Sequence, residues 1–226
     1  MAGPSGVALA ILLLCGAARA EFPLRVNSAL YQEPGEANVA AWVERDRRHA
    51  GNGYEAQLQV VVLEGLEFQL SLSRRYEREE DSGSLHAMHG SEIELVWVPW
   101  RRAHAWSWGI AAGGTREGDA RGAEIALVGS RPLEGDHPRA LHVNLGREQE
   151  REGAAKTRRG VLTVAYEHGV SRDATLLAEV QAYGGEKPLR HFGLRYRIAR
   201  DLHFGAMAGE NSAGTIARIG LVADFD

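Results

Sequence analysis

The sequence has almost no cysteine. Its single cysteine, Cys15, lies in an apolar run near the start of the chain. Exported domains that cannot build a large core commonly depend on disulfides. Because this chain cannot form them internally, its stability has to come from buried surface and a hydrogen-bonded backbone.

Long apolar runs and an excess of basic residues are also missing. After Ala20 no run is long enough for a transmembrane helix, which needs about 20 predominantly apolar residues. Lysine and arginine number 26 against 30 aspartate and glutamate residues, and no basic stripe dominates, so we expect no nucleic-acid partner. If the protein is in a membrane, it is there as strands.

The N-terminus has the pattern of a secretory signal peptide. An apolar run at 7–14 is followed by small residues and the tripeptide Ala-Arg-Ala at 18–20. Cleavage after Ala20 would remove the cysteine and leave roughly 205 residues, which suits one domain. The expected organisation is a cleaved signal peptide at 1–20, an N-terminal periplasmic segment at 21–34 and an outer-membrane β-barrel at 35–226.

From Gly35 onward, apolar and polar residues alternate with a period of two, which predicts β-strands. In LEFQLSLS (66–73), for example, the leucines and phenylalanine share one side, and the glutamate, glutamine and serines share the other. Helical periodicity is not convincing anywhere. The expected strands, about 12 in number, are 37–46, 53–63, 66–76, 91–99, 104–114, 122–130, 139–149, 159–169, 173–183, 189–199, 201–209 and 215–225.

The connections between these strands alternate in character. Those after even-numbered strands are mostly short, such as Glu64-Gly65 and Arg200. Those after odd-numbered strands are often longer and charged, such as EREEDSGSLHAMHG, TREGDARG and REQEREGAAKTRR. Short turns on one rim and longer loops on the other are typical of an outer-membrane barrel with both chain ends in the periplasm.

The aromatic residues favour a membrane barrel over a soluble sheet. A soluble sheet buries its apolar face, whereas a membrane barrel turns that face to lipid and keeps a polar lumen, and periodicity alone leaves both open. Membrane interfaces favour two bands of aromatic side chains. The expected bands are Trp97, Trp106, Trp108, Tyr166, Tyr196, Phe204 and Phe225 near the short turns, and Tyr54, Tyr76 and Phe192 near the long loops.

We therefore expect an all-β fold, a transmembrane antiparallel up-and-down β-barrel of about 12 strands, with 10–14 strands compatible with the pattern. A soluble secreted β-protein is the alternative. The polar alternates would line the lumen, and the expected lumen residues are Glu55, Glu67, Glu92, Glu94, Glu124, His142, Asn144, Glu167, Glu179, His191, Arg195, Arg197, His203 and Arg218.

Two features of this expected lumen bear on whether it is open. Glu179 and Arg195 project inward from neighbouring strands and could pair across the wall, bracing it or defining a polar path for solute. Small residues share the inward face and favour a narrow pore over a plugged one. They are Ala105, Ser107, Gly109, Gly146, Ala165, Gly193, Gly205 and Gly220.

The C-terminal part of the chain resembles a known family. The segments LHVNLGREQERE (141–152), GVLTVAYEHGVSRDATLLAEVQAYGGE (160–186), HFGLRYRIARDLHFGAMAG (191–209) and IARIGLVADFD (216–226) are similar to the closing strands of the outer-membrane barrels grouped as the MetA-pathway of phenol degradation or putative transporter family. The resemblance implies an outer-membrane location and transport of small hydrophobic or aromatic compounds. It implies no catalytic residues.

The sequence gives weak signals for a catalytic site and for a metal site. His142 and Asn144 share a face, and a serine on a neighbouring strand could complete a nucleophile–base set, but no G-x-S-x-G signal accompanies them. His86 and His89 have a spacing that suits a metal, yet a solvated surface loop explains them better. We therefore expect that the protein is not an enzyme and that it has no catalytic residues, no metal and no cofactor.

The sequence thus predicts a porin-like channel or transporter for small solutes, located in the cell outer membrane of a Gram-negative organism. The alternatives are a non-conducting structural or surface-interaction barrel, a soluble secreted β-protein and an outer-membrane enzyme. Expected partners are membrane lipid, lipopolysaccharide at the charged rim RRYEREED, the outer-membrane insertion machinery and a small-molecule solute of unknown identity. A monomer is expected.

Overall fold

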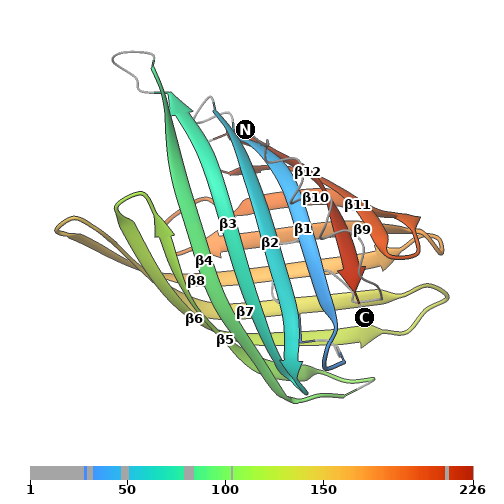
Figure 1. The fold of residues 1–226 in the computed structure, drawn as a ribbon. Coiled ribbons are helices and arrows are strands. Elements are labelled where there is room, and N and C mark those ends of the chain that lie inside the picture. The colour runs from blue at the N-terminus through green and yellow to red at the C-terminus, as the bar shows by residue number, and fades with distance from the viewer. Residues whose placement is uncertain are drawn as a thin grey trace.

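A computed structural model describes residues 28–29, 33–46, 51–78, 84–102, 104–211 and 214–225. Its strands form one closed antiparallel barrel (Figure 1). The strands are β1 (Ala37–Asp46), β2 (Gly51–Leu63), β3 (Leu66–Arg78), β4 (Leu85–Trp100), β5 (Ser107–Glu117), β6 (Ala120–Leu133), β7 (Arg139–Glu152), β8 (Ala155–Gly169), β9 (Ala174–Tyr183), β10 (Leu189–Ala199), β11 (Leu202–Asn211) and β12 (Gly214–Phe225).

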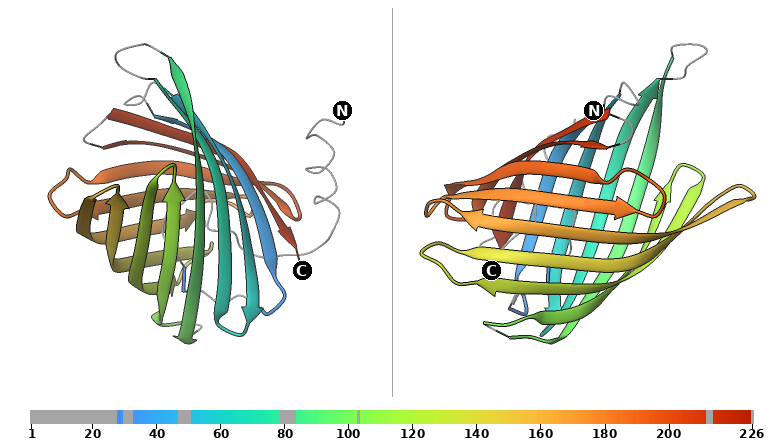
Figure 2. Two further views of the ribbon diagram at one scale, coloured as in Figure 1. Left: turned by 60° about the vertical axis from the view of Figure 1, so that its left-hand side comes forward. Right: turned by 180° about the vertical axis from the view of Figure 1, so that it is seen from behind.

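Each strand pairs with its neighbours in the chain, and β1 closes the barrel on β12. Ala37 lies opposite Phe225 at one end of this seam, and Asp46 lies opposite Ile216 at the other. Strands on opposite sides of the barrel cross steeply, as the tilt of a closed barrel requires (Figure 2). The predicted fold class and strand number are confirmed. The described part of the chain contains no helix long and apolar enough to cross a bilayer.

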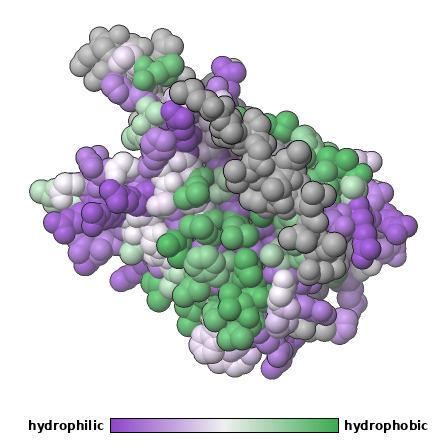
Figure 3. Space-filling model, viewed as in Figure 1, coloured by the Kyte–Doolittle hydropathy of each residue, from purple (hydrophilic) through white to green (hydrophobic). Residues whose placement is uncertain are grey.

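Burial alternates along the strands, with the polar side inward. On β4, Glu94 and Val96 are 4% and 2% exposed, whereas the intervening Leu95 and Trp97 are 48% and 52% exposed. Leu72, Ile125, Leu145, Phe192 and Ile219 are similarly exposed on other strands. Figure 3 shows a continuous apolar surface over the middle of the wall that faces the viewer, with hydrophilic residues to either side. The leucines of the LEFQLSLS stretch therefore face outward, toward lipid.

The predicted long loops after β5 and β7 are wrong. TREGDARG forms the end of the β5–β6 hairpin around Gly118-Asp119, and REQEREGAAKTRR forms the β7–β8 hairpin around Gly153-Ala154. Gly118 and Gly153 adopt φ values of 57° and 56°, which tight hairpin turns require and glycine tolerates. Beyond the membrane both faces of a strand meet water, so charged residues there continue the strand pairing instead of ending it.

The prediction that SLHAMHG is a surface loop is also wrong, because this polar segment continues the strand pairing. Its residues from Leu85 onward belong to β4, where His86 lies opposite Glu77 and His89 lies opposite Arg74. Residues 47–50 and 79–83 of the predicted loops, and the signal peptide at 1–20, lie outside the described residues.

Aromatic residues lie at the strand ends on the outer face, as the two bands require. Trp97 and Tyr196 are 52% and 45% exposed, and Trp108 stacks on Trp106 with ring centroids 5.1 Å apart. Toward the other rim, Tyr54 meets Tyr76 edge to face at 6.2 Å.

Candidate functional site

The interior of the barrel is the candidate site. The structure places the predicted lumen residues at inward-facing positions of their strands. Glu67, Glu94, His142, Asn144, Glu179 and His191 are buried there. The others are partly exposed, and they are Glu55, Glu92, Glu124, Glu167, Arg195, Arg197, His203 and Arg218.

A chain of polar contacts crosses the inner wall from β6 to β10. Ser130 Oγ lies 2.9 Å from Nδ1 of His142, which sits directly opposite it on β7. The other ring nitrogen of His142, Nε2, lies 3.6 Å from Oε1 of Glu167 on β8. Glu167 in turn accepts a hydrogen bond from Arg195 Nη2 on β10 at 2.5 Å. These four side chains therefore tie four strands together across the lumen surface.

The chain before β1 also reaches this wall. The backbone N–H of Ala29 donates to Ser130 Oγ at 2.7 Å, and Ala29 has no exposed surface. It packs with inward-facing side chains of β4, β5 and β6, here called the apolar cup. The apolar cup consists of Val96, Val98, Ala111 and Val128.

The structure brings further pairs together on the side formed by β9 to β12 and β1. His191 Nδ1 lies 3.2 Å from the carboxylate of Glu179, its partner across the β9–β10 pair. His203 Nε2 lies 3.0 Å from Asp224. These contacts connect inward side chains of adjacent strands.

Arginines on this side lie against carboxylates. Arg218 donates to Glu44 at 2.9 Å across the β1–β12 seam and lies over the Trp42 ring, 4.9 Å from its centroid. Arg197 donates to Asp173 at 2.6 Å. The positive charges of this wall are therefore locally compensated.

The opposite side of the lumen, on β2 to β6, is acidic. Glu92, Glu94 and Glu124 have carboxylate oxygens within 4.8 Å of one another. Among the described residues they form a group whose donors suit a hard cation such as Ca²⁺ or Mg²⁺. On the neighbouring strand β3, Glu67 accepts a hydrogen bond from the Gln69 amide at 2.6 Å. Four inward carboxylates therefore gather on this side of the lumen.

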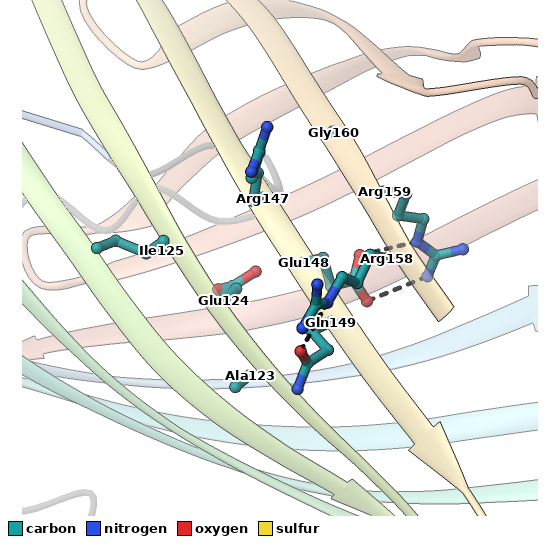
Figure 4. A pocket seen from close by; sticks show the side chains of 9 residues that line it. All are labelled: Ala123, Glu124, Ile125, Arg147, Glu148, Gln149, Arg158, Arg159 and Gly160. Atoms are coloured by element: carbon teal, nitrogen blue, oxygen red, sulfur yellow. Dashed lines mark hydrogen bonds and ion pairs between the residues drawn. The ribbon is translucent and has the colours of Figure 1, made fainter. Parts of the chain in front are cut away.

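A pocket of about 540 Å³ lies where β6, β7 and β8 extend toward the β7–β8 hairpin. Figure 4 shows Glu148 and Arg159 joined from neighbouring strands, with distances of 3.0 and 3.1 Å from the guanidinium nitrogens to the two carboxylate oxygens. Glu124 lies opposite Glu148 on β6. The pocket therefore combines two carboxylates with the guanidinium groups of Arg147, Arg158 and Arg159 near the rim.

The inward glycines do not leave the open space that the sequence suggested. A Cβ at Gly193 would collide with Met207, and a Cβ at Gly220 would collide with Trp42. At Gly146 the neighbouring Ala126 fills the same space. Side chains of adjacent strands lean over these glycines, so the glycines allow close packing of the wall.

Sequence reasoning missed several members of the network. Ser130, Glu44 and Asp224 were not singled out, although each occupies an inward alternate of its strand and the two-residue period could have found them. Arg195 was expected to pair with Glu179, yet its partner across the β9–β10 pair is Thr175, and Glu167 receives its hydrogen bond. The strand register, which the sequence does not reveal, decides these partners.

The contacts of Ser130 and His142 bear on catalysis. A serine beside a histidine that contacts a carboxylate has the composition of a nucleophile–base–orienter set. Ser130, however, has no exposed surface, and its Oγ already accepts the N–H of Ala29. In this arrangement no substrate carbonyl can reach Ser130, and the contact serves to hold Ala29.

No family model matches the chain, and no curated protein matches it by sequence. Among solved structures it is similar to the KdgM porin, with 16% identity and a TM-score of 0.64 over 84% of this chain and 99% of that chain. A structure of the KdgM porin in complex with disordered oligogalacturonate gives a TM-score of 0.60 at the same identity and coverage. The translocator domain of autotransporter NalP from Neisseria meningitidis gives 0.47 at 9% identity, over 84% of this chain and 87% of that domain.

These likenesses concern the fold. Together with the apolar outer belt and the polar inner wall, the likeness to the KdgM porin defines the protein as a transmembrane β-barrel of the outer-membrane type. The resemblance of the C-terminal strands to the phenol-degradation family stays a prediction, because no family model matches.

Proposed function

We propose that the protein is a monomeric channel of the cell outer membrane that passes small polar solutes. The observation that carries this proposal is the inner wall. Its charged and polar side chains are held in cross-strand contacts, while the outer face carries an exposed apolar belt. A barrel of about 12 strands is wider than the small barrels that side chains fill, which leaves room for a path.

The charges of the inner wall favour cations over anions. The inward carboxylates Glu67, Glu94 and Glu124 lie on one side, and the inward arginines of the other side contact carboxylates of their own. Acidic side chains therefore outnumber basic ones among the described inward residues. A permeating ion feels the summed potential of such fixed charges, so this wall attracts cations.

The nature of the solute follows from the same charges. Oligogalacturonate, which is bound in one structure of the KdgM porin, carries carboxylates that this acidic wall would repel. The family resemblance instead implies hydrophobic or aromatic compounds. The apolar surface that could receive them, the apolar cup, is covered by Ala29. Small polar cations and neutral polar solutes therefore fit the lumen better.

A non-conducting structural barrel is the second candidate. The observation in its favour is the number of contacts that brace the inner wall. Glu167 on β8 contacts His142 on the neighbouring strand β7, and it also contacts Arg195 on β10, which is not a direct neighbour of β8. In that case the network would serve stability alone.

Recordings of the refolded protein in planar lipid bilayers would test the proposal. We expect discrete current steps, and a reversal potential in a KCl gradient that shows cation preference. Liposome swelling with neutral sugars and small amines would then rank solutes. A correctly folded barrel, verified by heat-modifiable migration on gels, that gives no current at any voltage would favour the structural barrel. Recovery from the periplasm without detergent would contradict the outer-membrane location.

A further inference from the structure

Ala29, which precedes β1 in the chain, lies inside the barrel. Ala29 has no exposed surface, and its neighbours in the apolar cup belong to inward faces. The outward alternates beside them, Trp97, Ile110 and Leu127, are 42–52% exposed. Ala29 therefore occupies the lumen, in contact with the wall formed by β4, β5 and β6.

A polar contact fixes this position. The N–H of Ala29 donates to Ser130 Oγ at 2.7 Å, and Ser130 also contacts His142 at 2.9 Å. A buried backbone N–H without a partner is costly, so the serine supplies what the inserted backbone needs. Ser130 lies near the end of β6, which places the contact close to the rim where β6 leads into β7.

A second anchor lies on another part of the same rim. Gly35 N–H donates to the carbonyl of Val61 at 2.9 Å, and Val61 N–H donates to the carbonyl of Glu36 at 2.8 Å. The backbone N–H of Glu33 donates to the Glu36 carboxylate at 2.7 Å, which closes a compact turn. Val61 lies on β2, and β3, β4 and β5 separate β2 from β6.

We propose that the backbone at Ala29 constricts the mouth of the channel at the rim where β6 leads into β7. The chain before β1 is anchored at two points of one rim: Gly35 is hydrogen-bonded to Val61 of β2, and Ala29 is hydrogen-bonded to Ser130 of β6. Because a barrel of this size is intermediate between filled barrels and wide porins, one inserted backbone removes a large share of the free cross-section. The inference rests on the proposed channel function and adds the element that sets its conductance.

Displacement of Ala29 tests the constriction. The variant Ala29→Trp cannot occupy a site without free surface, so its backbone should leave the apolar cup. We expect its single-channel conductance to exceed that of wild type by at least about two-fold. Deletion of residues 23–32 should have the same effect without adding a bulky side chain, and it keeps the test valid if the tryptophan variant does not fold.

Two serines provide a matched comparison. Ser130→Ala removes the acceptor for Ala29 and should raise conductance or add frequent open-state fluctuations. Ser107→Ala removes another buried inward serine at the same end, whose Oγ contacts the backbone of Arg102, and should conduct like wild type.

The outcomes separate the two proposals. Equal conductance of wild type, Ala29→Trp and the deletion variant, all folded by heat-modifiability, would overturn the constriction and leave the channel function standing. A silent wild type with a conducting deletion variant would support the constriction. Silence of both folded proteins would overturn the channel function itself.

Discussion

Arg195 on β10 reaches past β9 to Glu167 on β8, with its Nη2 2.5 Å from a carboxylate oxygen. On β9 between them, Glu179 contacts His191 of β10 instead. Both members of the Arg195–Glu167 pair are largely buried, with side chains 16% and 14% exposed. The three strands are therefore held by side chains in addition to backbone pairing.

Loss of Arg195 should destabilise the barrel. Arg195→Gln leaves the Glu167 carboxylate in a poorly solvated site, which we expect to cost about 3 kcal/mol. The double variant Arg195→Gln with Glu167→Gln should recover part of that loss, because the orphaned charge is gone. Urea titrations in lipid vesicles would measure both. Arg200→Gln is the control, since the Arg200 side chain is 83% exposed and its ion pair at 3.7 Å should contribute little.

The orientation of β3 gives a second prediction. Leu70 lies opposite Leu58 and Ile93 on the outer face, whereas Ser71 is buried on the inner face opposite Glu92. Leu70→Arg should cost about 2–4 kcal/mol near the bilayer midplane. Ser71→Arg should cost less, because it meets a carboxylate in the lumen. A larger loss for Ser71→Arg in folding titrations would contradict the orientation of the wall.

Gly129 makes room for a tryptophan on the outer face. A Cβ at this position would overlap the ring of Trp108, which stacks on Trp106. Gly129→Ala should therefore displace Trp108, lower stability by about 1–3 kcal/mol and weaken the near-ultraviolet circular dichroism of the stacked pair. Gly160→Ala should change neither property, since its nearest heavy atom would lie 4.0 Å away. An unchanged spectrum for Gly129→Ala would show that the stacked pair stays in place and would contradict this prediction.

The acidic side of the lumen gives a prediction on ion selectivity. Glu94→Gln combined with Glu124→Gln removes charge where carboxylates gather. The permeability ratio of cation to anion, from reversal potentials in a KCl gradient, should fall by at least about two-fold. Glu134→Gln, in the exposed β6–β7 connection, should leave the ratio unchanged. Equal ratios in all three proteins would place the permeation path away from these carboxylates.

The sequence predicted the strands and their faces well because alternation is a local property. Whether a residue such as Leu70 or Ser71 faces out or in depends only on its position in a two-residue period and on which side meets lipid. The prediction of long loops around Gly118 and Gly153 was wrong. Charged residues around them suggested loops, whereas two tight turns let the strands continue into water.

The sequence did not predict which inward side chains contact each other, and the reason is the strand register. Glu179 and Arg195 are on neighbouring strands in any up-and-down barrel, but the register places His191 opposite Glu179 and Thr175 opposite Arg195. A shift of two residues would preserve both faces and change every pair. Register is set by the turns and by packing of the whole wall, so it cannot be derived from one strand.

The sequence by itself therefore determined an antiparallel barrel with an apolar exterior and a charged lumen, because periodicity and the membrane environment suffice for that result. The tertiary structure alone decided the register at the β1–β12 seam, the network from Ser130 through His142 and Glu167 to Arg195, and the insertion of Ala29 into the lumen. These features join residues far apart in the chain. Their energies depend on distances that only the closed barrel defines.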